Sequence, residues 1–438
     1  MENDRLKDAA RKIFYEALDR VDAGDAVRNA VRSDGETLWI RDEPAIDLSR
    51  PIYVVAIGKA AYPMAAAFDD VAGDHIKAGV VSGVRSTATS TCGPALEKFY
   101  GGHPLPNEES IEAATACLKV LDQASGEKAP VVFLISGGGS AMMELSRDPR
   151  VMLSHLIELN KTLITSGASI AEINVVRRAV SAVKGGGLAI RAANSQQFSL
   201  IVSDTRSDDV TSVASGPSLL PSRGTIDPLE VIERHGLAKR IPEVVLRSLG
   251  ESDPDPDVKL ESKYEILLDN QRLDEAAAEA ASRMGFFVGT DDGDQDEMID
   301  VGVERLVDRA FDLRKRSTGD EPICFISGGE FACPVKGNGT GGRNCETVLR
   351  AALQSDKLAE SKNFAILSAG SDGIDGNSPA AGGVIDGSTL AVARSMGLDP
   401  LSHLEASDSY TFLKGVGAAI ETGPTGTNVR DLRIVILE

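Results

Sequence analysis

The residues with the clearest chemical potential are glycines and serines that follow a short apolar run. Residues 131–135 are all apolar and lead directly into Ser136, Gly137, Gly138, Gly139 and Ser140. Consecutive glycines let the backbone approach a ligand closely, and their amide N–H groups near a helix start favour an anion such as phosphate. A tight turn that needs positive φ is the competing interpretation, but three glycines between two serines exceed that need. The pattern predicts an anion-binding loop.

Two charged residues also follow apolar runs. Lys59 comes after residues 51–57 and a single glycine, and Asp204 comes after residues 198–203. Lys59 would bring an ammonium group to the same sheet edge, although a solvated surface lysine has the same sequence context. A carboxylate at Asp204 could accept a proton from an attacking hydroxyl or hold Mg²⁺. Helix capping by Ser207 or Asp208 is the competing explanation for this polar segment.

A further polar group precedes a second glycine triplet. If residues 174–184 are helical, four side chains share one helix face at spacings of i, i+3, i+7 and i+10: Asn174, Arg177, Ser181 and Lys184. An exposed basic face would look the same. The glycines at 185–187 that follow directly favour a binding role.

The second half of the chain repeats these features. The apolar run 322–326 leads into Ser327, Gly328, Gly329 and Glu330. A second glycine-rich segment, residues 337–342, leads into a predicted helix through Arg343 and Asn344. Asp372 and Asp375 are three residues apart in a glycine-rich loop, which suits a divalent cation such as Mg²⁺. Asp-Gly pairs also simply make turns, so the metal site and the turn remain equal alternatives.

One pattern points to a different chemistry. Gly337, Gly339 and Gly342 have the spacing of a dinucleotide-binding fingerprint, which would make the protein an NAD(P)H-dependent reductase. Pro334 falls within the strand that this fingerprint needs, at residues 331–336, and proline fits a central strand poorly. The sequence has no P-loop, protein-kinase motif set or HExxH zinc motif. Spacing alone therefore indicates an anion-binding α/β enzyme and goes no further.

The elements that must position these residues alternate between strands and helices. Apolar runs at 51–57, 131–135, 198–203, 264–268, 322–326, 364–367 and 432–437 predict strands. Helical patterns between them predict sheets covered by helices, with ligands beyond the carboxyl ends of the strands. An acidic, proline-containing linker at residues 250–258 suggests two domains, 1–245 and 246–438.

Composition limits the partners and the cellular location. The 438 residues carry a formal net charge of −20, which repels nucleic acid and anionic membranes. No stretch approaches the roughly 18 apolar residues of a membrane span, and the amphipathic N-terminus resembles neither a signal nor a transit peptide. The five cysteines form no CxxC pair, which predicts reduced thiols in a cytoplasmic protein. The oligomeric state stays open, with a homodimer among the options.

Taken in order, these motifs resemble the glycerate 2-kinase family, whose C-terminal region is called the MOFRL domain. The resemblance spans nearly the whole chain. Individually the motifs are modest, but ten in sequence are specific: residues 57–60 (IGKA), 102–106 (GHPLP), 134–141 (LISGGGSA), 172–177 (EINVVR), 202–204 (VSD), 214–217 (ASGP), 327–330 (SGGE), 341–344 (GGRN), 372–376 (DGIDG) and 422–428 (TGPTGTN).

The resemblance implies ATP-dependent phosphorylation of D-glycerate at its 2-hydroxyl, giving 2-phosphoglycerate and ADP with the help of Mg²⁺. It implies an N-terminal Rossmann-like parallel sheet, a C-terminal α/β domain with a MOFRL region at about 320–438, and an active site in the cleft between them. Lys59 and Arg343 would be its main cationic groups. Relatives labelled hydroxypyruvate reductase keep that activity as the alternative, and a catalytically inactive sensor is a third hypothesis.

On this basis each motif receives an expected role. Catalytic residues would be Lys59 and Arg343 for charge neutralisation and Asp204 as the base. ATP would contact Ser136, Gly137, Gly138, Gly139, Ser140, Ser327, Gly328, Gly329, Glu330, Asn344 and Asn428. Glycerate would contact Asn174, Arg177 and Lys184, and Mg²⁺ would contact Asp372 or Asp375. The chain departs from common family patterns at Gly187, where arginine is frequent, at Phe331 and Ala332, where two threonines are frequent, and at Thr340, where a basic residue is frequent.

Overall fold

The computed structural model describes residues 2–85, 91–206, 209–221, 226–251, 260–291, 296–317, 319–354 and 363–438. Residues 252–258 of the expected linker, and the cap candidates Ser207 and Asp208, lie outside these ranges. The chain forms two compact units, one of residues 23–267 and one of residues 1–22 together with 268–438. None of the helices within the described ranges has the length and apolar character needed to cross a membrane.

The unit of residues 23–267 is built on a six-stranded sheet with the order β6-β5-β4-β7-β8-β9. Its strands are β4 (Ile52–Ile57), β5 (Ile76–Gly83), β6 (Leu96–Tyr100), β7 (Val131–Ser136), β8 (Gln197–Val202) and β9 (Ser262–Leu268). The pairs β4–β5, β5–β6, β4–β7 and β7–β8 are parallel. Every residue of β4 and β7 is buried, which explains why both read as continuous apolar runs. This confirms the Rossmann-like parallel sheet.

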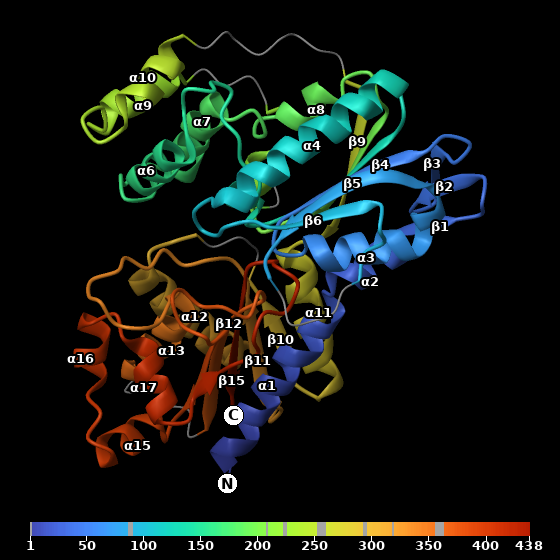
Figure 1. The fold of residues 1–438 in the computed structure, drawn as a ribbon. Coiled ribbons are helices and arrows are strands. Elements are labelled where there is room, and N and C mark those ends of the chain that lie inside the picture. Colours follow the sequence, from blue (N-terminus) through green and yellow to red (C-terminus); the bar gives the residue numbers. More distant parts are fainter. Residues whose placement is uncertain are drawn as a thin grey trace. The chain divides into compact units, whose positions relative to one another are not determined.

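Helices on this sheet are α3 (Ala61–Ala72), η1 (Gly73–His75), α4 (Glu108–Glu127), α5 (Gly139–Met142), α8 (Gly187–Arg191) and η2 (Val210–Ser215). A separate helical group has its own apolar core and consists of α6 (Leu153–Ile164), α7 (Ile170–Val180), α9 (Pro228–Arg234) and α10 (Glu243–Gly250) (Figure 1). Helix α2 (Ala23–Ala30) precedes a small antiparallel sheet of β1 (Val31–Ser33), β2 (Thr37–Ile40) and β3 (Glu43–Asp47).

The second unit contains a mixed sheet with the order β10-β11-β15-β12-β13-β14. Its strands are β10 (Phe287–Thr290), β11 (Ile323–Ser327), β12 (Phe364–Gly370), β13 (Gly382–Asp386), β14 (Ala419–Ile420) and β15 (Asp431–Leu437). Strand β15 is antiparallel to both β11 and β12. The helices are α1 (Glu2–Arg20), α11 (Asn270–Arg283), α12 (Ile299–Arg316), α13 (Arg343–Leu353), α15 (Thr389–Ser395), α16 (Pro400–Glu405) and α17 (Ser409–Gly415). Helices α12 and α13 share one core with the sheet, and α1 and α11 lie side by side (Figure 1).

The division between the units differs from the expected boundary at residue 245. That residue lies inside α10, whose Val245 is fully buried in the core of the helical group. The first 22 residues belong with the C-terminal part of the chain because α1 buries an apolar stripe that includes Leu6, Ile13 and Phe14, and it packs on β12, β13 and α11. Sequence order alone placed this helix in the N-terminal domain.

Candidate active site

The parallel sheet has a topological switch point between its two central strands. From β4 the chain moves outward to β5 and β6, and it then returns to add β7 on the other side of β4. Loops leaving the carboxyl ends of such strands diverge, and ligands of open α/β sheets bind in the crevice between them. Lys59 follows β4 and the segment Gly137–Ser140 follows β7, so both occupy this position.

Backbone hydrogen bonds hold the two segments against each other. The Lys59 amide donates to the Gly137 carbonyl at 2.9 Å, and the Ala60 amide donates to Ser136 Oγ at 3.0 Å. The same Ser136 hydroxyl donates to the Ile57 carbonyl at 3.3 Å. Ser136 is therefore a buried residue that ties the two turns together, and Gly137–Ser140 remain the predicted ligand contacts.

Two glycines make this close approach possible. Gly58 has φ of +118°, and a Cβ atom there would lie 2.3 Å from the Ser136 carbonyl oxygen. Gly138 has φ of +77°, and its Cβ would lie 3.1 Å from Lys59 Cγ and 3.2 Å from His103 Cδ2. The Lys59 side chain thus passes directly over the glycine loop. His103 is a second neighbour of this loop, and the sequence did not indicate a role for it.

Asp204 lies at the same sheet edge. Strand β8 runs parallel to β7, with Val202 in register with Ser136. Asp204 follows two residues later and is half-buried. The carboxylate and the ammonium predicted from the sequence are therefore brought to one sheet edge by β4 and β8, which lie 145 residues apart in the chain.

The predicted helix ends before residue 184, so the four polar residues of the predicted stripe do not share one helix face. Helix α7 ends at Val180, and Ser181 adopts an extended conformation as its C-cap. Lys184, which is 1% exposed, instead forms an ion pair with Glu144, whose other oxygen accepts a hydrogen bond from Ser181 Oγ at 2.6 Å. Burial lowers the pKa of Lys184, and the adjacent Glu144 carboxylate opposes that shift. Lys184 thus has a protein carboxylate as its partner, and its role as a glycerate ligand stays a prediction.

The other two residues of the predicted stripe have separate partners. Arg177 is half-buried and its Nε donates to Asn160 Oδ1 at 2.8 Å. Asn174 is buried, and its Oδ1 accepts a hydrogen bond from Ser215 Oγ at 3.0 Å. Ser215 Oγ is also 3.0 Å from Ser140 Oγ, so a hydroxyl contact joins Asn174 to the glycine loop. The 214–217 motif was visible in the sequence, but nothing in its spacing indicated this contact.

In the second unit, the loops after β11 and β12 and the segment before β15 meet at one sheet edge because β15 runs antiparallel between the other two strands. Asn270 at the start of α11 joins the loop after β11 to the chain around the start of β15. Its Nδ2 donates to the carbonyls of Val429 and Asp431 at 3.0 and 3.1 Å, and its Oδ1 accepts from the Gly329 amide at 2.6 Å. Gly328 must lack a side chain, since a Cβ there would lie 2.1 Å from this oxygen.

Several predicted nucleotide ligands therefore have structural roles. The Gly329 amide is used by Asn270, and Ser327 is completely buried. Asn344 is also buried and accepts a hydrogen bond from Ser368 Oγ at 2.6 Å. Asn428 lies in the segment before β15 and is 7% exposed. These residues shape the loops, and burial leaves Ser327 and Asn344 little access to a ligand.

Arg343 is held by two carboxylates. Its Nε and Nη2 donate to the two oxygens of Asp431 at 2.5 and 3.0 Å, and Nη2 lies 2.8 Å from Glu330 Oε1. Burial disfavours the charged guanidinium, but the Asp431 and Glu330 charges outweigh that effect and hold the pKa of Arg343 well above its usual range. The cation predicted from the sequence is therefore permanently charged and fixed in orientation, with Asp431 as a partner that the sequence did not indicate.

Asp375, one of the two predicted metal ligands, has a structural role that the sequence did not indicate. Its two oxygens accept hydrogen bonds from the amides of Asn344 and Cys345 at 3.0 and 2.8 Å, so it caps the N-terminus of α13. The residue is 2% exposed, and burial raises its pKa to about 6. Asp372 is half-buried and accepts from the Ile374 amide at 3.0 Å. The described residues contain no cluster of three or more potential metal-binding side chains.

The glycines of the dinucleotide fingerprint have a different structural context from the one it needs. No strand covers residues 331–336, where only Ala332 makes an isolated bridge. The amides of Gly339, Thr340 and Gly341 donate to Ala406, Asp408 and Asn377 respectively, at 2.8 to 2.9 Å. Amides committed to protein acceptors cannot cradle a pyrophosphate, so this segment lacks the physical basis of dinucleotide binding.

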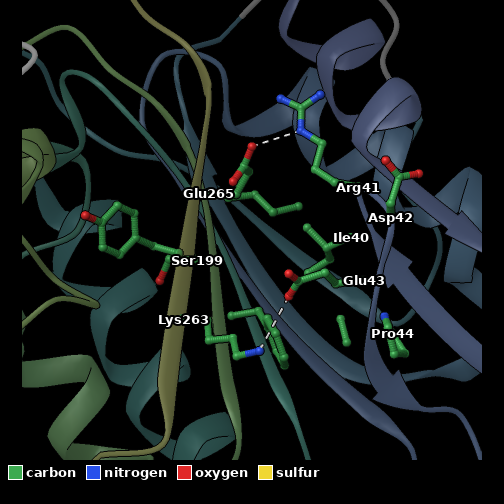
Figure 2. Close-up of a pocket in the computed structure, with 12 residues that line it drawn as sticks. Ile40, Arg41, Asp42, Glu43, Pro44, Ser199, Lys263 and Glu265 are labelled. Carbon is green, nitrogen blue, oxygen red and sulfur yellow. Dashed lines mark hydrogen bonds and ion pairs between the residues drawn. The ribbon is translucent and has the colours of Figure 1, made fainter.

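A cavity of about 400 Å³ lies elsewhere in the parallel-sheet unit, between the β2–β3 hairpin and strands β8 and β9 (Figure 2). Two ion pairs span the opening: Arg41 Nε is 2.9 Å from Glu265 Oε1, and Lys263 Nζ is 3.8 Å from Glu43 Oε2. None of the residues predicted to bind substrate or nucleotide lines this cavity. The ion pairs fasten the hairpin to β9, which is a structural role.

The fold and these loops define a class of protein: a two-unit α/β protein with a glycine-rich loop at the switch point of a parallel sheet. Comparisons with known proteins narrow this class to a family. The family described as "Domain of unknown function (DUF4147)" matches residues 9–250, and the MOFRL family matches residues 323–431. D-glycerate 2-kinase from Thermotoga maritima is 38% identical, over 99% of this chain and 98% of the relative.

Comparison with solved structures points to the same family. The crystal structure of glycerate kinase from Thermotoga maritima superimposes with a TM-score of 0.81 and 33% identity, covering 99% of this chain and 100% of the other. A protein from Agrobacterium vitis, provisionally named a hydroxypyruvate reductase, is 34% identical over 88% of this chain and 98% of its own length. The chain belongs to the glycerate 2-kinase family, which confirms the resemblance seen in the sequence.

Proposed function

We propose that this protein is an ATP-dependent kinase that phosphorylates D-glycerate at the 2-hydroxyl. One observation carries the proposal in the structure: an ammonium group, Lys59, lies over a loop of three glycines at the switch point of a parallel sheet. Similarity to glycerate kinases over 99% of the chain supports the same activity. Phosphoryl transfer requires mainly positioning and charge neutralisation, and the arrangement of Lys59 and the loop suits both.

In this proposal, the amides of Gly137–Ser140 and the Lys59 ammonium bind phosphate oxygens of the nucleotide. Asp204, at the same sheet edge, accepts the proton of the 2-hydroxyl as the oxygen attacks phosphorus. Arg177 already uses Nε on Asn160, and we propose that the rest of its guanidinium pairs with the glycerate carboxylate. Asn174 acts through Ser215 on the loop, so it supports the site without a required contact to glycerate.

In the second unit, we propose that Arg343 contacts the transferring phosphoryl group through Nη2, the guanidinium nitrogen that lies beside Glu330 in the structure. Asp431 stays as the permanent partner, because its bidentate contact fixes the plane of the guanidinium. An Arg343 that kept both carboxylates would carry little net positive charge toward a phosphate. Glu330 is therefore the residue whose release is expected to accompany nucleotide binding.

Mg²⁺ is proposed as the cofactor that accompanies the nucleotide. Magnesium sites in phosphotransferases commonly use one or two carboxylates, with the remaining ligands from phosphate oxygens and water. Asp372 fits that pattern as a half-buried carboxylate, whereas Asp375 does not, since both of its oxygens accept amides. The ion would neutralise phosphate charge, and Asp372 would hold it. We also propose a cytoplasmic location, which agrees with five free cysteines in the described residues.

The activity test offers the purified protein D-glycerate with Mg-ATP and, separately, hydroxypyruvate with NADH or NADPH. Formation of 2-phosphoglycerate without loss of reduced-cofactor absorbance is expected. Lys59→Ala should lower turnover about 10²–10³-fold, and Lys239→Ala, which removes an exposed lysine of the helical group, should leave it unchanged. Cofactor oxidation without phosphoglycerate would overturn the proposal, and formation of 3-phosphoglycerate alone would overturn the 2-hydroxyl specificity.

A further inference from the structure

Next to the glycine loop, three consecutive residues adopt the left-handed conformation. Ala214, Ser215 and Gly216 have φ of 51°, 62° and 67°. Residues other than glycine rarely adopt this conformation, because Cβ then crowds the backbone. Two adjacent non-glycine residues in it form a strained turn, which persists only where its surroundings hold it. Strain of this kind concentrates at functional sites, so the surroundings of the turn are informative.

The turn is held from several sides by backbone contacts. The Ser215 carbonyl accepts the Gly185 amide at 3.0 Å, and the Gly216 carbonyl accepts the Gly186 amide at 2.6 Å. The Arg178 side chain adds a hydrogen bond from Nε to the Ser215 carbonyl at 3.4 Å. Two residues of the second glycine triplet, Gly185 and Gly186, therefore fasten the 214–216 turn.

The turn presents one hydroxyl group to the glycine loop. Ser215 is 3% exposed, and its Oγ donates to Asn174 Oδ1 at 3.0 Å while lying 3.0 Å from Ser140 Oγ. A serine hydroxyl has one proton. Because that proton is used on Asn174, the contact with Ser140 is made by the Ser140 proton, and the hydrogen bonds run from Ser140 to Ser215 to Asn174.

The turn also limits the position of the loop by direct packing. A Cβ on Gly139 would lie 2.8 Å from the Ala214 Cβ and 2.8 Å from Ile57 Cγ2. Gly139 is therefore enclosed by the strained turn on one side and by strand β4 on the other. The packing fixes where the loop lies, and the hydroxyl chain fixes how its last residue, Ser140, is rotated.

We propose that Ser215 is a positioning residue for the phosphate-binding loop, holding the Ser140 backbone amide in the orientation that a nucleotide phosphate requires. The inference rests on the proposed function, because it assumes that the segment Gly137–Ser140 binds phosphate. It adds that the strained turn exists to place the Ser215 hydroxyl. The Ser140 hydroxyl, whose proton is used on Ser215, is a support for the loop, and the amides are the phosphate donors.

The test compares two glycine substitutions in the same turn. Ser215→Gly removes the hydroxyl and relieves one strained residue, and Ala214→Gly relieves one strained residue but keeps the hydroxyl. Binding of Mg-ADP and of inorganic tripolyphosphate is measured by calorimetry, with kcat, the KM values for ATP and glycerate, and the melting temperature. We expect Ser215→Gly to weaken both ligands and raise KM for ATP by about tenfold, the effect of a lost hydrogen-bond chain, with KM for glycerate unchanged. Ala214→Gly keeps the hydroxyl and removes only the methyl group beside Gly139, so it should weaken both ligands clearly less than Ser215→Gly does.

A double-mutant cycle checks the coupling. If the chain acts as a unit, Ser140→Ala alone and Ser140→Ala with Ser215→Gly should weaken Mg-ADP binding equally. Additive losses would overturn the proposal, as would a Ser215→Gly enzyme that keeps its affinity, or an Ala214→Gly enzyme that loses as much. Ser140→Ala keeps the test decisive if Ser215→Gly fails to fold. A wild-type protein that neither binds Mg-ADP nor makes phosphoglycerate would instead overturn the proposed function.

Discussion

Substitution of Gly58 by alanine tests the geometry of the candidate site directly. Gly58 joins β4 to Lys59, and its φ of +118° lies in a region that an alanine occupies only under strain. Forcing a non-glycine residue there costs roughly 1–3 kcal/mol. The new Cβ would also lie 2.3 Å from the Ser136 carbonyl oxygen, where ordinary contacts begin at 3.4 Å.

This overlap of about 1 Å cannot be relieved by a side-chain rotation, since the Ser136 carbonyl carbon is also only 2.7 Å away. Overpacking of this kind costs roughly another 1–3 kcal/mol. Together the two effects predict a loss of about 2–6 kcal/mol in the free energy of unfolding, within the 5–15 kcal/mol typical of a folded domain. The protein should fold, but the Lys59 turn and the glycine loop should be displaced from each other.

A displacement of about 1 Å between reacting groups can reduce activity about 10²-fold. We therefore expect kcat/KM for glycerate phosphorylation to fall by at least that factor, measured alongside the urea midpoint of unfolding. Gly126→Ala is the matched control, because Gly126 lies in α4 with nothing within 4 Å of its Cβ position. Alanine there should stabilise the helix by about 0.5–1 kcal/mol and leave activity unchanged. A Gly58→Ala enzyme with wild-type activity and midpoint would refute the reasoning.

Three further predictions follow from single contacts. Lys59→Ala should lower kcat about 10²–10³-fold in the steady-state assay, with Lys239→Ala as control, because the ammonium acts on developing charge. Glu144→Ala should lower the free energy of unfolding in urea by about 3–5 kcal/mol, because it leaves the buried ammonium of Lys184 without a partner. Asp375 has a folded pKa of about 6, above its unfolded value, so the folded state holds the proton more tightly and stability falls as pH rises from about 4 to 6. Asp375→Asn should remove roughly 2–3 kcal/mol of that fall, measured as the difference between the two pH profiles of unfolding.

Each of these three predictions can be contradicted by a specific result. An active Lys59→Ala enzyme would mean that the ammonium does not act on phosphate. A Glu144→Ala protein as stable as the wild type would show that water or another group compensates Lys184. Identical pH profiles for the wild type and Asp375→Asn would mean that the buried carboxyl titrates as it does in the unfolded chain.

Much of the fold was predictable because local patterns carried it. Strands β4, β7 and β8 are uninterrupted apolar runs, since central parallel strands are buried on both faces, and glycine and polar residues mark their ends. The rule that ligands bind at the carboxyl ends of such strands then predicted from the sequence alone that Lys59, the glycine loop and Asp204 share one sheet edge. Helix α7 was predicted too long because its polar spacing continues past Val180, whereas the chain turns there to bring Ser181 and Lys184 to Glu144.

The sequence by itself determined the alternation of strands and helices, the loops that could bind anions and the family. These depend on residue types and on spacings of a few positions, which local physical chemistry interprets. Only the tertiary structure decided which polar groups are occupied by other protein groups. It assigned Asp431 to Arg343, Glu144 to Lys184, the α13 amides to Asp375 and Ser215 to Ser140. Such partners lie tens of residues apart in the chain, and their pairing follows from the need to satisfy every buried polar group, which no local pattern records.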